Sequence, residues 1–140
     1  MHINLESDYA IRIVHCLTLA QLRMDAQTIA DTTNVSLRFT LKIMRKLVSA
    51  GIVQSFKGAH GGYILACPPA EITIRQVIEA VEGPYRFSRC LDDDYVCSCG
   101  PGCPFQAVFN EVTDMVRKKL DSVTFQELSG NAQAVQRKNT

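Results

Sequence analysis

The chain has 140 residues, of which 46% are hydrophobic and 21% are charged. This composition is that of a folded protein with one small domain, or one domain and an appendage, and it excludes wholesale disorder, collagen-like repeats and a large two-domain enzyme. Fifteen Lys and Arg residues against fourteen Asp and Glu residues give a formal net charge of +1, so any affinity for nucleic acid must come from where the charges lie.

Three helices are predicted in the first part of the chain. Apolar residues at three- and four-residue spacing predict an amphipathic helix over residues 7–22, with Ser7 as its N-cap. Asp25 can cap a second, short helix. Ser36 can cap a third helix that runs to Gly51, where a left-handed residue is expected. The third helix is expected to turn four side chains to the core, those of Thr40, Ile43, Leu47 and Ala50.

A β-hairpin and a fourth helix follow. Two β-prone runs, residues 52–56 and 63–66, are joined by a glycine-rich turn and predict the hairpin. Thr73 and Gln76 form a capping box for a helix that stops at Gly83.

The predicted fold is mainly α with a small β-hairpin, a winged helix-turn-helix domain over residues 1–83 plus a long C-terminal dimerisation helix. Residues 84–103 show little periodicity and are expected to form a cysteine-rich loop. Residues 104–128 carry a broad apolar stripe and then a short capped turn. This helix either packs back on the body or pairs with its counterpart in a second chain, and its position after an apparently complete small domain favours pairing to give a homodimer. Residues 129–140 are polar and are expected to be a flexible tail.

The N-terminal residues favour a protein that is not exported. Glu6 and Asp8 stand where a signal peptide needs a cationic end followed by an apolar stretch. The uncharged apolar runs are far shorter than the roughly 20 residues of a membrane-spanning helix. We therefore expect a cytoplasmic protein without a membrane partner, whose cysteines act as thiols or metal ligands rather than as disulfides.

Basic charge is concentrated in the third helix and the hairpin. Between Thr32 and Ala70 the chain has five Lys and Arg residues and no Asp or Glu, a local balance of +5 that leaves −4 for the rest of the chain. We interpret this stretch as a footprint for the phosphates of double-stranded DNA, against the alternative of an ordinary solvated helix face. The candidate contacts are Ser36, Arg38, Phe39 and Lys42 for base edges, Arg45 and Lys46 for phosphates, and Lys57 and His60 for the minor groove.

Four of the six cysteines fall within fourteen residues of one another. Thiols at this density favour a metal centre. Zinc commonly uses Cys-x-x-Cys pairs a dozen or more residues apart, which this sequence lacks, whereas an iron–sulfur cluster tolerates irregular spacing because it brings its own geometry. We therefore favour an iron–sulfur cluster and leave zinc, thiol redox chemistry and an inert loop as alternatives. The four residues are Cys90, Cys97, Cys99 and Cys103. No convincing set of catalytic residues is found, so an enzyme is not expected.

A family resemblance is carried by the stretch VSLRFTLKIMRKLVSAGIVQSFKGAHGGYILA and the following PPAEITIRQVIEAVEGP. These motifs, together with the late cysteines, closely resemble the IscR/NsrR-type winged-helix transcription regulators of the Rrf2 family, over about residues 1–128. The resemblance implies a homodimeric protein that binds promoter DNA. Several members hold an iron–sulfur cluster, here expected as 2Fe–2S or 4Fe–4S, that reports on iron, nitric oxide or redox state.

The resemblance also implies a ligand set. Position by position, it gives three cluster ligands, Cys90, Cys97 and Cys103. IscR-like members use a His three residues after the last cysteine as the fourth ligand, but this chain has Gln106 there. NsrR-like members use an Asp near the N-terminus of the other subunit, and Asp8 stands at that place. Asp8 and Cys99 are therefore rival fourth ligands, and the plain alternative for Asp8 is a helix-capping acid.

The sequence thus favours an iron–sulfur-dependent transcriptional regulator that binds promoter DNA as a homodimer and changes its operator affinity with the state of the cluster. Lys57 and the Thr40-Leu41-Lys42 segment differ from the family pattern, so the operator cannot be copied from a relative. The alternative is a metal-free or thiol-based winged-helix adaptor that acts through a protein partner.

Overall fold

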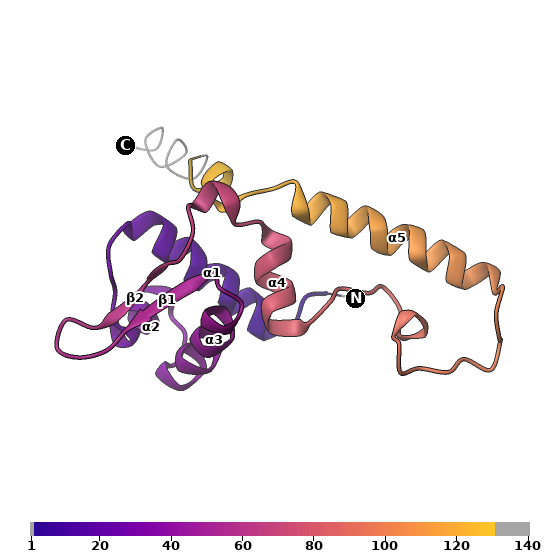
Figure 1. Cartoon of the computed structure of the whole chain (residues 1–140), viewed down its shortest axis with the longest axis horizontal. Helices are drawn as coiled ribbons and strands as arrows, with labels where there is room; N and C mark the ends of the chain where they lie inside the picture. Colours follow the sequence, from indigo (N-terminus) through magenta and orange to yellow (C-terminus); the bar gives the residue numbers. More distant parts are fainter. Residues whose placement is uncertain (1, 131–140) are drawn as a thin grey trace.

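The computed structural model describes residues 2–130, in which a helical body carries a hairpin at one side and a long helical arm at the other (Figure 1). The elements follow in the order α1 (Leu5–Ala20), α2 (Ala26–Thr33), α3 (Leu37–Ser49), β1 (Val53–Phe56), β2 (Gly62–Leu65), α4 (Ile74–Glu82) and α5 (Pro104–Asp121), with short 3-10 helices at Pro69–Glu71 and Arg89–Leu91. This is the predicted fold, mainly helical with one antiparallel hairpin. Within the described residues, no helix is long and apolar enough to cross a membrane.

Local capping sets where most helices begin, as the sequence predicts. Asp25, Ser36 and Thr73 each occupy an N-cap and accept a hydrogen bond from the backbone N–H three residues further on. Thr73 and Gln76 form the predicted capping box. Gly51 follows α3 in the left-handed conformation, with φ of +76°. Short-range chemistry therefore fixes the lengths of these elements.

The start of α1 differs from the prediction. The helix begins at Leu5, and Asn4 is its N-cap, since Asn4 Oδ1 accepts a hydrogen bond from the Ser7 N–H at 2.9 Å. Ser7 is fully buried instead, and its hydroxyl donates to Glu82 Oε1 at 2.5 Å. Glu82 ends α4, so a contact with a distant helix rather than local capping uses this serine.

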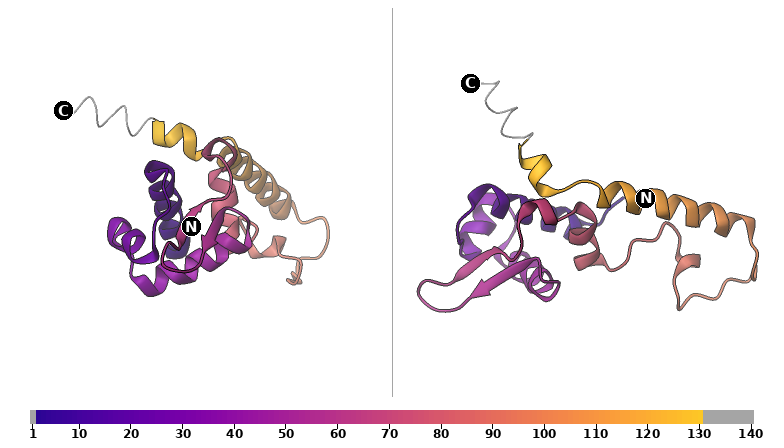
Figure 2. Two further views of the ribbon diagram at one scale, coloured as in Figure 1. Left: turned by 60° about the vertical axis from the view of Figure 1, so that its left-hand side comes forward. Right: turned by 45° about the horizontal axis from the view of Figure 1, so that its top comes forward.

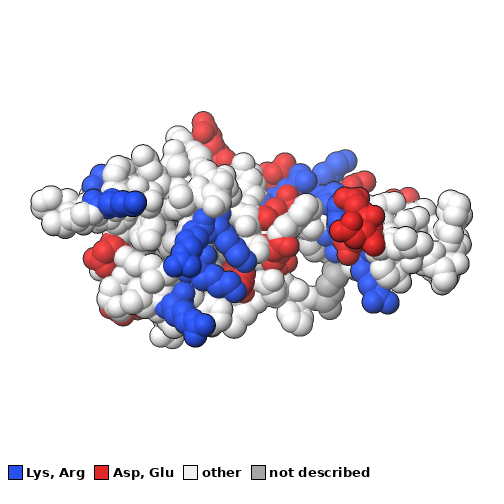
Figure 3. Space-filling model, turned by 60° about the horizontal axis from the view of Figure 1, so that its bottom comes forward, with Lys and Arg blue, Asp and Glu red and all other residues white. Residues whose placement is uncertain are grey.

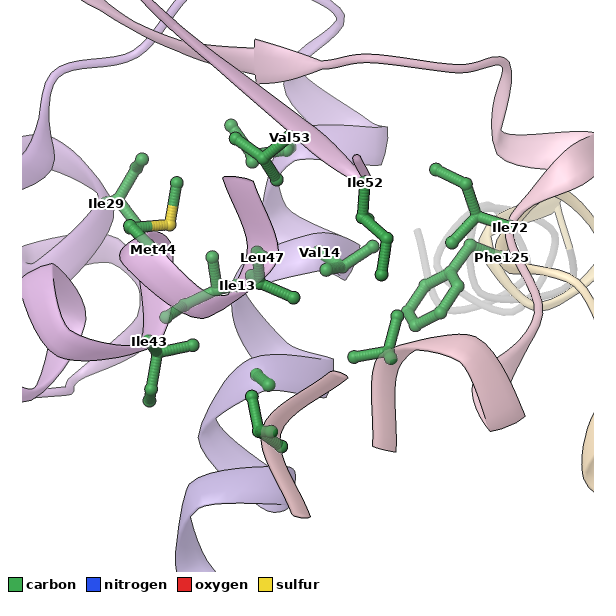
Figure 4. Packing of buried hydrophobic residues seen from close by; sticks show 14 residues of the cluster. Ile13, Val14, Ile29, Ile43, Met44, Leu47, Ile52, Val53, Ile72 and Phe125 are labelled. Carbon is green, nitrogen blue, oxygen red and sulfur yellow. The ribbon is translucent and has the colours of Figure 1, made fainter. Parts of the chain in front are cut away.

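The core is shared by the helices of the body, the hairpin and the chain that returns after α5 (Figure 4). Three of the four predicted core positions of α3, Thr40, Ile43 and Leu47, are fully buried. Ala50 is exposed, which corrects the prediction, because α3 ends at Ser49 and Ala50 is its C-cap. Met44 is the further inward-facing residue of this helix.

The segment after α5 is tied to the body by backbone and core contacts. Phe125 is only 1% exposed and its N–H donates to the carbonyl of Ile72 at 3.0 Å. Residues 125–130 are helical, and Ser129 is buried with its hydroxyl 3.3 Å from Nδ1 of His15. The first two residues of the predicted tail thus lie in this helix, and residues 131–140 lie outside the described residues.

The arm formed by α5 projects from the body, and the segment that leads to it runs out along the arm (Figures 1 and 2). Phe87 attaches this segment to α5, because its ring lies 5.3 Å from that of Phe109 and its N–H donates to Thr113 Oγ1 at 3.1 Å. Much of the predicted apolar stripe of α5 is open to solvent, with Phe105 69% and Met115 70% exposed.

Candidate functional site

The outer side of α3 carries the four predicted cations, on a face where Lys and Arg side chains gather (Figure 3). Arg38 and Arg45 are exposed, and among residues 2–130 neither has a carboxylate within ion-pair distance. These two guanidinium groups are free to contact an anion. The helix N-terminus, where Ser36 Oγ accepts a hydrogen bond from the Phe39 N–H at 3.2 Å, is exposed as well.

The two lysines of α3 are not free. Glu6, on the first turn of α1, pairs with Lys42 at 2.5 Å and with Lys46 at 2.7 Å. Hydrogen bonds from Lys42 and Lys46 lower the pKa of the Glu6 carboxyl below its ordinary value of 4.5. The stretch without acids in the sequence therefore receives an acid from a distant part of the chain, and the charge that α3 offers to a ligand is smaller than its composition indicates.

An aromatic pair continues this contact between α1 and α3. The ring of Phe39, which is 39% exposed, meets the ring of Tyr9 edge to face at 5.9 Å. Phe39 also lines a shallow hollow of about 340 Å³ with Arg38 and Lys42. Three of the four residues predicted to reach base edges thus surround one depression on the outer face of α3.

The hairpin forms a wing whose shape requires its glycines. Lys57 and His60 are exposed in the turn, as a contact with DNA requires. A Cβ on Gly61 would lie 2.6 Å from the carbonyl oxygen of Phe56, and one on Gly62 would lie 2.7 Å from that of Met24. Both distances are too short for any side chain, so the tight turn depends on glycine at these positions.

Arg23 also contacts the wing, although the sequence pattern does not predict it as a site residue. Its guanidinium stacks over the ring of Phe56 at 3.6 Å and donates to the carbonyl oxygen of His60 at 2.8 Å. It therefore braces the turn and adds a cation beside Lys57 and His60. Arg23 precedes the predicted second helix and lies 37 residues from His60 in sequence, so no local pattern could have identified it.

The four clustered cysteines are brought together at the outer end of the arm. They line one pocket of about 200 Å³ with Tyr95, Phe105 and Phe109 among its walls. The Cys99 N–H donates to Cys97 Sγ at 3.5 Å. A hydrogen bond with Cys97 and the negative charge of Cys97 and Cys103 raise the pKa of the Cys99 thiol. All four are free thiols.

This pocket is a gathering of thiols rather than a closed coordination shell. Within residues 2–130, no three His, Cys, Asp or Glu side chains are placed to bind a single metal ion. Gln106, at the position where IscR-like proteins have a His, donates from Nε2 to the carbonyl oxygen of Cys90 at 3.2 Å and so links the cysteine segment to α5. Arg86 holds the same segment through Asp92 and Asp93, each at 3.2 Å.

Asp8 lies apart from the cysteines within one chain. It belongs to α1 in the body and is not among the residues that line the cysteine pocket. Its carboxylate pairs with Arg12 one turn further along the helix, at 2.8 Å. Any ligand role for Asp8 thus requires the cysteine segment of a second subunit, as the resemblance implies.

Comparison with known proteins identifies relatives along the whole described chain. The sequence model of the Rrf2 family, described as an iron-dependent transcriptional regulator, matches residues 3–131. The HTH-type transcriptional regulator CymR of Bacillus subtilis is 29% identical over 133 residues, which cover 92% of this chain and 90% of CymR. The HTH-type transcriptional regulator NsrR of the same species is 27% identical over 134 residues, with the same two coverages of 92% and 90%.

Two solved structures share the fold. The structure of B. subtilis CymR, described as the global cysteine regulator, has a TM-score of 0.75 at 28% identity and covers 94% of this chain and 98% of that one. The structure of T. potens IscR has a TM-score of 0.76 at 23% identity and covers 97% of this chain and 91% of that one. The winged body and the long arm are therefore common to these proteins.

Proposed function

The chain belongs to the Rrf2 family of DNA-binding transcriptional regulators, which are not enzymes, and from this premise we propose that it is a cluster-dependent member. In this proposal a homodimer binds promoter DNA and changes its operator affinity with the state of an iron–sulfur cluster, in response to iron, redox state or nitric oxide. The observation that carries the proposal is the pocket lined by Cys90, Cys97, Cys99 and Cys103.

The donor set of this pocket fits an iron–sulfur cluster. Clusters are held by thiolates, and four thiols face one cavity here. A hydrogen bond with Cys97 and the nearby charge of Cys97 and Cys103 raise the pKa of the Cys99 thiol, and a bound cation would favour its thiolate form. Cys90, Cys97 and Cys103 would hold the cluster, with either Cys99 or Asp8 of the second subunit as the fourth ligand. When bound, the cluster supplies a centre that responds to oxidation state and to small diatomic ligands.

The residues around the pocket can pass a change in ligation to the body. The cysteine segment leads directly back to the end of α4, where Glu82 accepts hydrogen bonds from the Asn4 N–H at 2.8 Å and from the Ser7 hydroxyl. Ordering or release of residues 90–103 would therefore act on the first turn of α1, beside α3. Typical coupling free energies of about 1–3 kcal/mol would change operator affinity roughly 5- to 150-fold.

Dimerisation through α5 is part of the proposal. Phe105, Val108 and Met115 are among the large apolar side chains that the single chain leaves exposed, and all three lie on this helix. Burial of such a face stabilises an association by about 25 cal/mol for each Å² of apolar surface removed from water. A second copy also supplies Asp8 to the partner's cysteine segment and gives two α3 helices for two half-sites. Residues 1–83 would then read DNA, residues 84–103 hold the cluster and residues 104–128 pair the subunits.

Anaerobic purification tests the cofactor. The protein is expected to be brown, with visible absorbance and acid-labile sulfide; a colourless protein that contains zinc, or only thiols, would reject the cluster and favour the metal-free alternative.

Asp8→Ala and Cys99→Ala then distinguish the two candidate fourth ligands, since the variant that removes the true ligand should lose the cluster while the other variant retains it. Gel filtration with light scattering measures the dimer, and a monomer at all concentrations would reject that part.

A further inference from the structure

An acidic side chain lies within the basic face of α3. Glu6 is 20% exposed, and each of its two carboxylate oxygens meets a different lysine of the helix, Oε1 that of Lys42 and Oε2 that of Lys46. The Glu6 carboxylate is favoured in its ionised form, because Glu6 lies in the first turn of α1, where backbone N–H groups and the helix dipole stabilise negative charge. The pair of lysines keeps its pKa low as well.

The two lysines depend on Glu6 to different extents. Lys46 is 36% exposed and has a second partner, the carbonyl oxygen of Val81 at 3.2 Å, so it is fixed between α1, α3 and α4. Lys42 is 53% exposed, and its other neighbour is the ring of Phe39 at 5.9 Å, which leaves its ammonium group within reach of solvent. Lys46 thereby holds Glu6 in place, and Lys42 is the cation that can leave.

We propose that Glu6 is an intramolecular competitor for DNA phosphate that withholds Lys42 from the backbone of nonspecific DNA. The inference goes beyond the cluster-dependent regulator, and it rests only on the proposed placement of α3 against DNA. Glu6 is a positioning residue in this role, since it acts through Lys42 and does not itself contact the duplex.

The physical reason is that carboxylate and phosphate oxygens offer a lysine the same kind of partner. Both accept charge-assisted hydrogen bonds. When Lys42 leaves Glu6 for a phosphate, it therefore replaces one anionic partner by another and gains no additional contact. Arg38 and Arg45 have no acidic partner among the described residues and gain a full contact when they meet a phosphate. Nonspecific affinity should therefore depend on the two arginines and little on Lys42.

The experiment measures binding of the full chain to a fluorescent duplex of random sequence over a series of salt concentrations. Glu6→Gln retains an amide oxygen for Lys46 but releases Lys42. We expect it to tighten nonspecific binding about two- to fivefold at low salt, the equivalent of one surface ion pair. The slope of log affinity against log salt should become more negative by about 0.9 for each subunit that gains a phosphate contact.

Two further variants identify Lys42 as the cause. Lys42→Ala should leave the nonspecific salt slope of the natural chain unchanged, and in the Glu6→Gln background it should abolish the gain. Glu71→Gln, on the exposed short 3-10 helix at Pro69–Glu71, changes the net charge equally and is the matched control, for which no change is expected. Equal behaviour of Glu6→Gln and Glu71→Gln would overturn the inference.

A last measurement distinguishes failure of this inference from failure of the proposed placement of α3 against DNA. Arg45→Ala should make the nonspecific slope less negative, and if it does not, α3 does not face DNA and the inference falls with that placement. If Arg45→Ala has its effect while Glu6→Gln has none, only the competitor role is rejected. Should Glu6→Gln fail to fold, as shown by urea unfolding, Lys42→Ala in the natural chain decides: a loss of about 0.9 in the slope contradicts the inference, and an unchanged slope supports it.

Discussion

Replacing Lys46 by Ala should damage the fold more than it damages DNA binding, although composition alone groups this residue with Arg45. The Lys46 ammonium group donates to Glu6 at 2.7 Å and to the carbonyl oxygen of Val81 at 3.2 Å, and the side chain is only 36% exposed. A partly exposed ion pair contributes about 0.2–1 kcal/mol, and a hydrogen bond that involves a charged group contributes about 1.5 kcal/mol or somewhat more. We expect Lys46→Ala to lower the free energy of unfolding by about 2 kcal/mol, the sum of these two contributions.

Arg45 is the matched comparison on the neighbouring position of α3. It is exposed and has no acidic partner among the described residues, so Arg45→Ala should change the free energy of unfolding by less than about 0.5 kcal/mol. It should instead reduce the salt dependence of DNA binding by about 0.9 log units per log unit of salt for each subunit. Urea unfolding and a salt titration of DNA affinity measure both quantities on both variants. A Lys46→Ala protein of natural stability that loses salt dependence as Arg45→Ala does would refute the reasoning.

Three more predictions concern the core, the acid range and the wing. Phe125→Ala should lower the free energy of unfolding by about 3–5 kcal/mol, because the ring is 1% exposed; a loss below about 1 kcal/mol in urea unfolding would show that the returning segment does not complete the core. Because the folded pKa of Glu6 is lowered, its ion pairs stabilise the fold above the ordinary value of 4.5, and this contribution is lost as the pH falls through the lowered pKa. Unfolding measured at stepwise lower pH should thus show a flatter acid decline for Glu6→Gln, and an identical decline would contradict the assignment. Gly61→Ala forces a Cβ to 2.6 Å from the Phe56 carbonyl oxygen, so we expect the free energy of unfolding to fall by about 1–3 kcal/mol and DNA binding to weaken. Gly130→Ala is the control, because its Cβ would meet nothing within 4 Å. Unchanged DNA affinity of Gly61→Ala would exclude the wing from the interface.

The parts of the fold that were predicted correctly depend on contacts between near neighbours in sequence. The caps at Asp25, Ser36 and Thr73 each join residues three positions apart, so the residue types alone locate the helix starts. The same rule predicts Ser7 as a cap, but its hydroxyl donates to Glu82, 75 residues away. The local rule is the same in both cases, and a long-range partner decides between them.

In the candidate site, too, contacts between residues distant in sequence are not predicted by local patterns. The absence of acids between Thr32 and Ala70 predicted an uncompensated basic face, but the fold brings Glu6 to Lys46 from 40 residues away. Arg23 joins the wing in the same manner, through His60. The four thiols line one pocket, and the metal centre that their spacing predicts stays a prediction. The spacing could not decide the fourth ligand, because Asp8 belongs to the body of the chain.

The body and the α5 arm have separate structural roles, because the segment that follows α5 completes the core of the body. Phe125 enters the body after α5 has ended, and the Ile74 N–H donates to the carbonyl oxygen of Val123 at 3.1 Å, so the chain that follows the arm is tied back to the winged domain. The body therefore completes its own core without the apolar face of α5. That face remains available for a second chain. The segment that carries the cysteines lies at the end of the arm furthest from its own α3 (Figure 1). In the proposed regulator, a change at the pocket would act on DNA by one of two routes: along the chain through Glu82, or across to the partner subunit, where Asp8 would be the ligand.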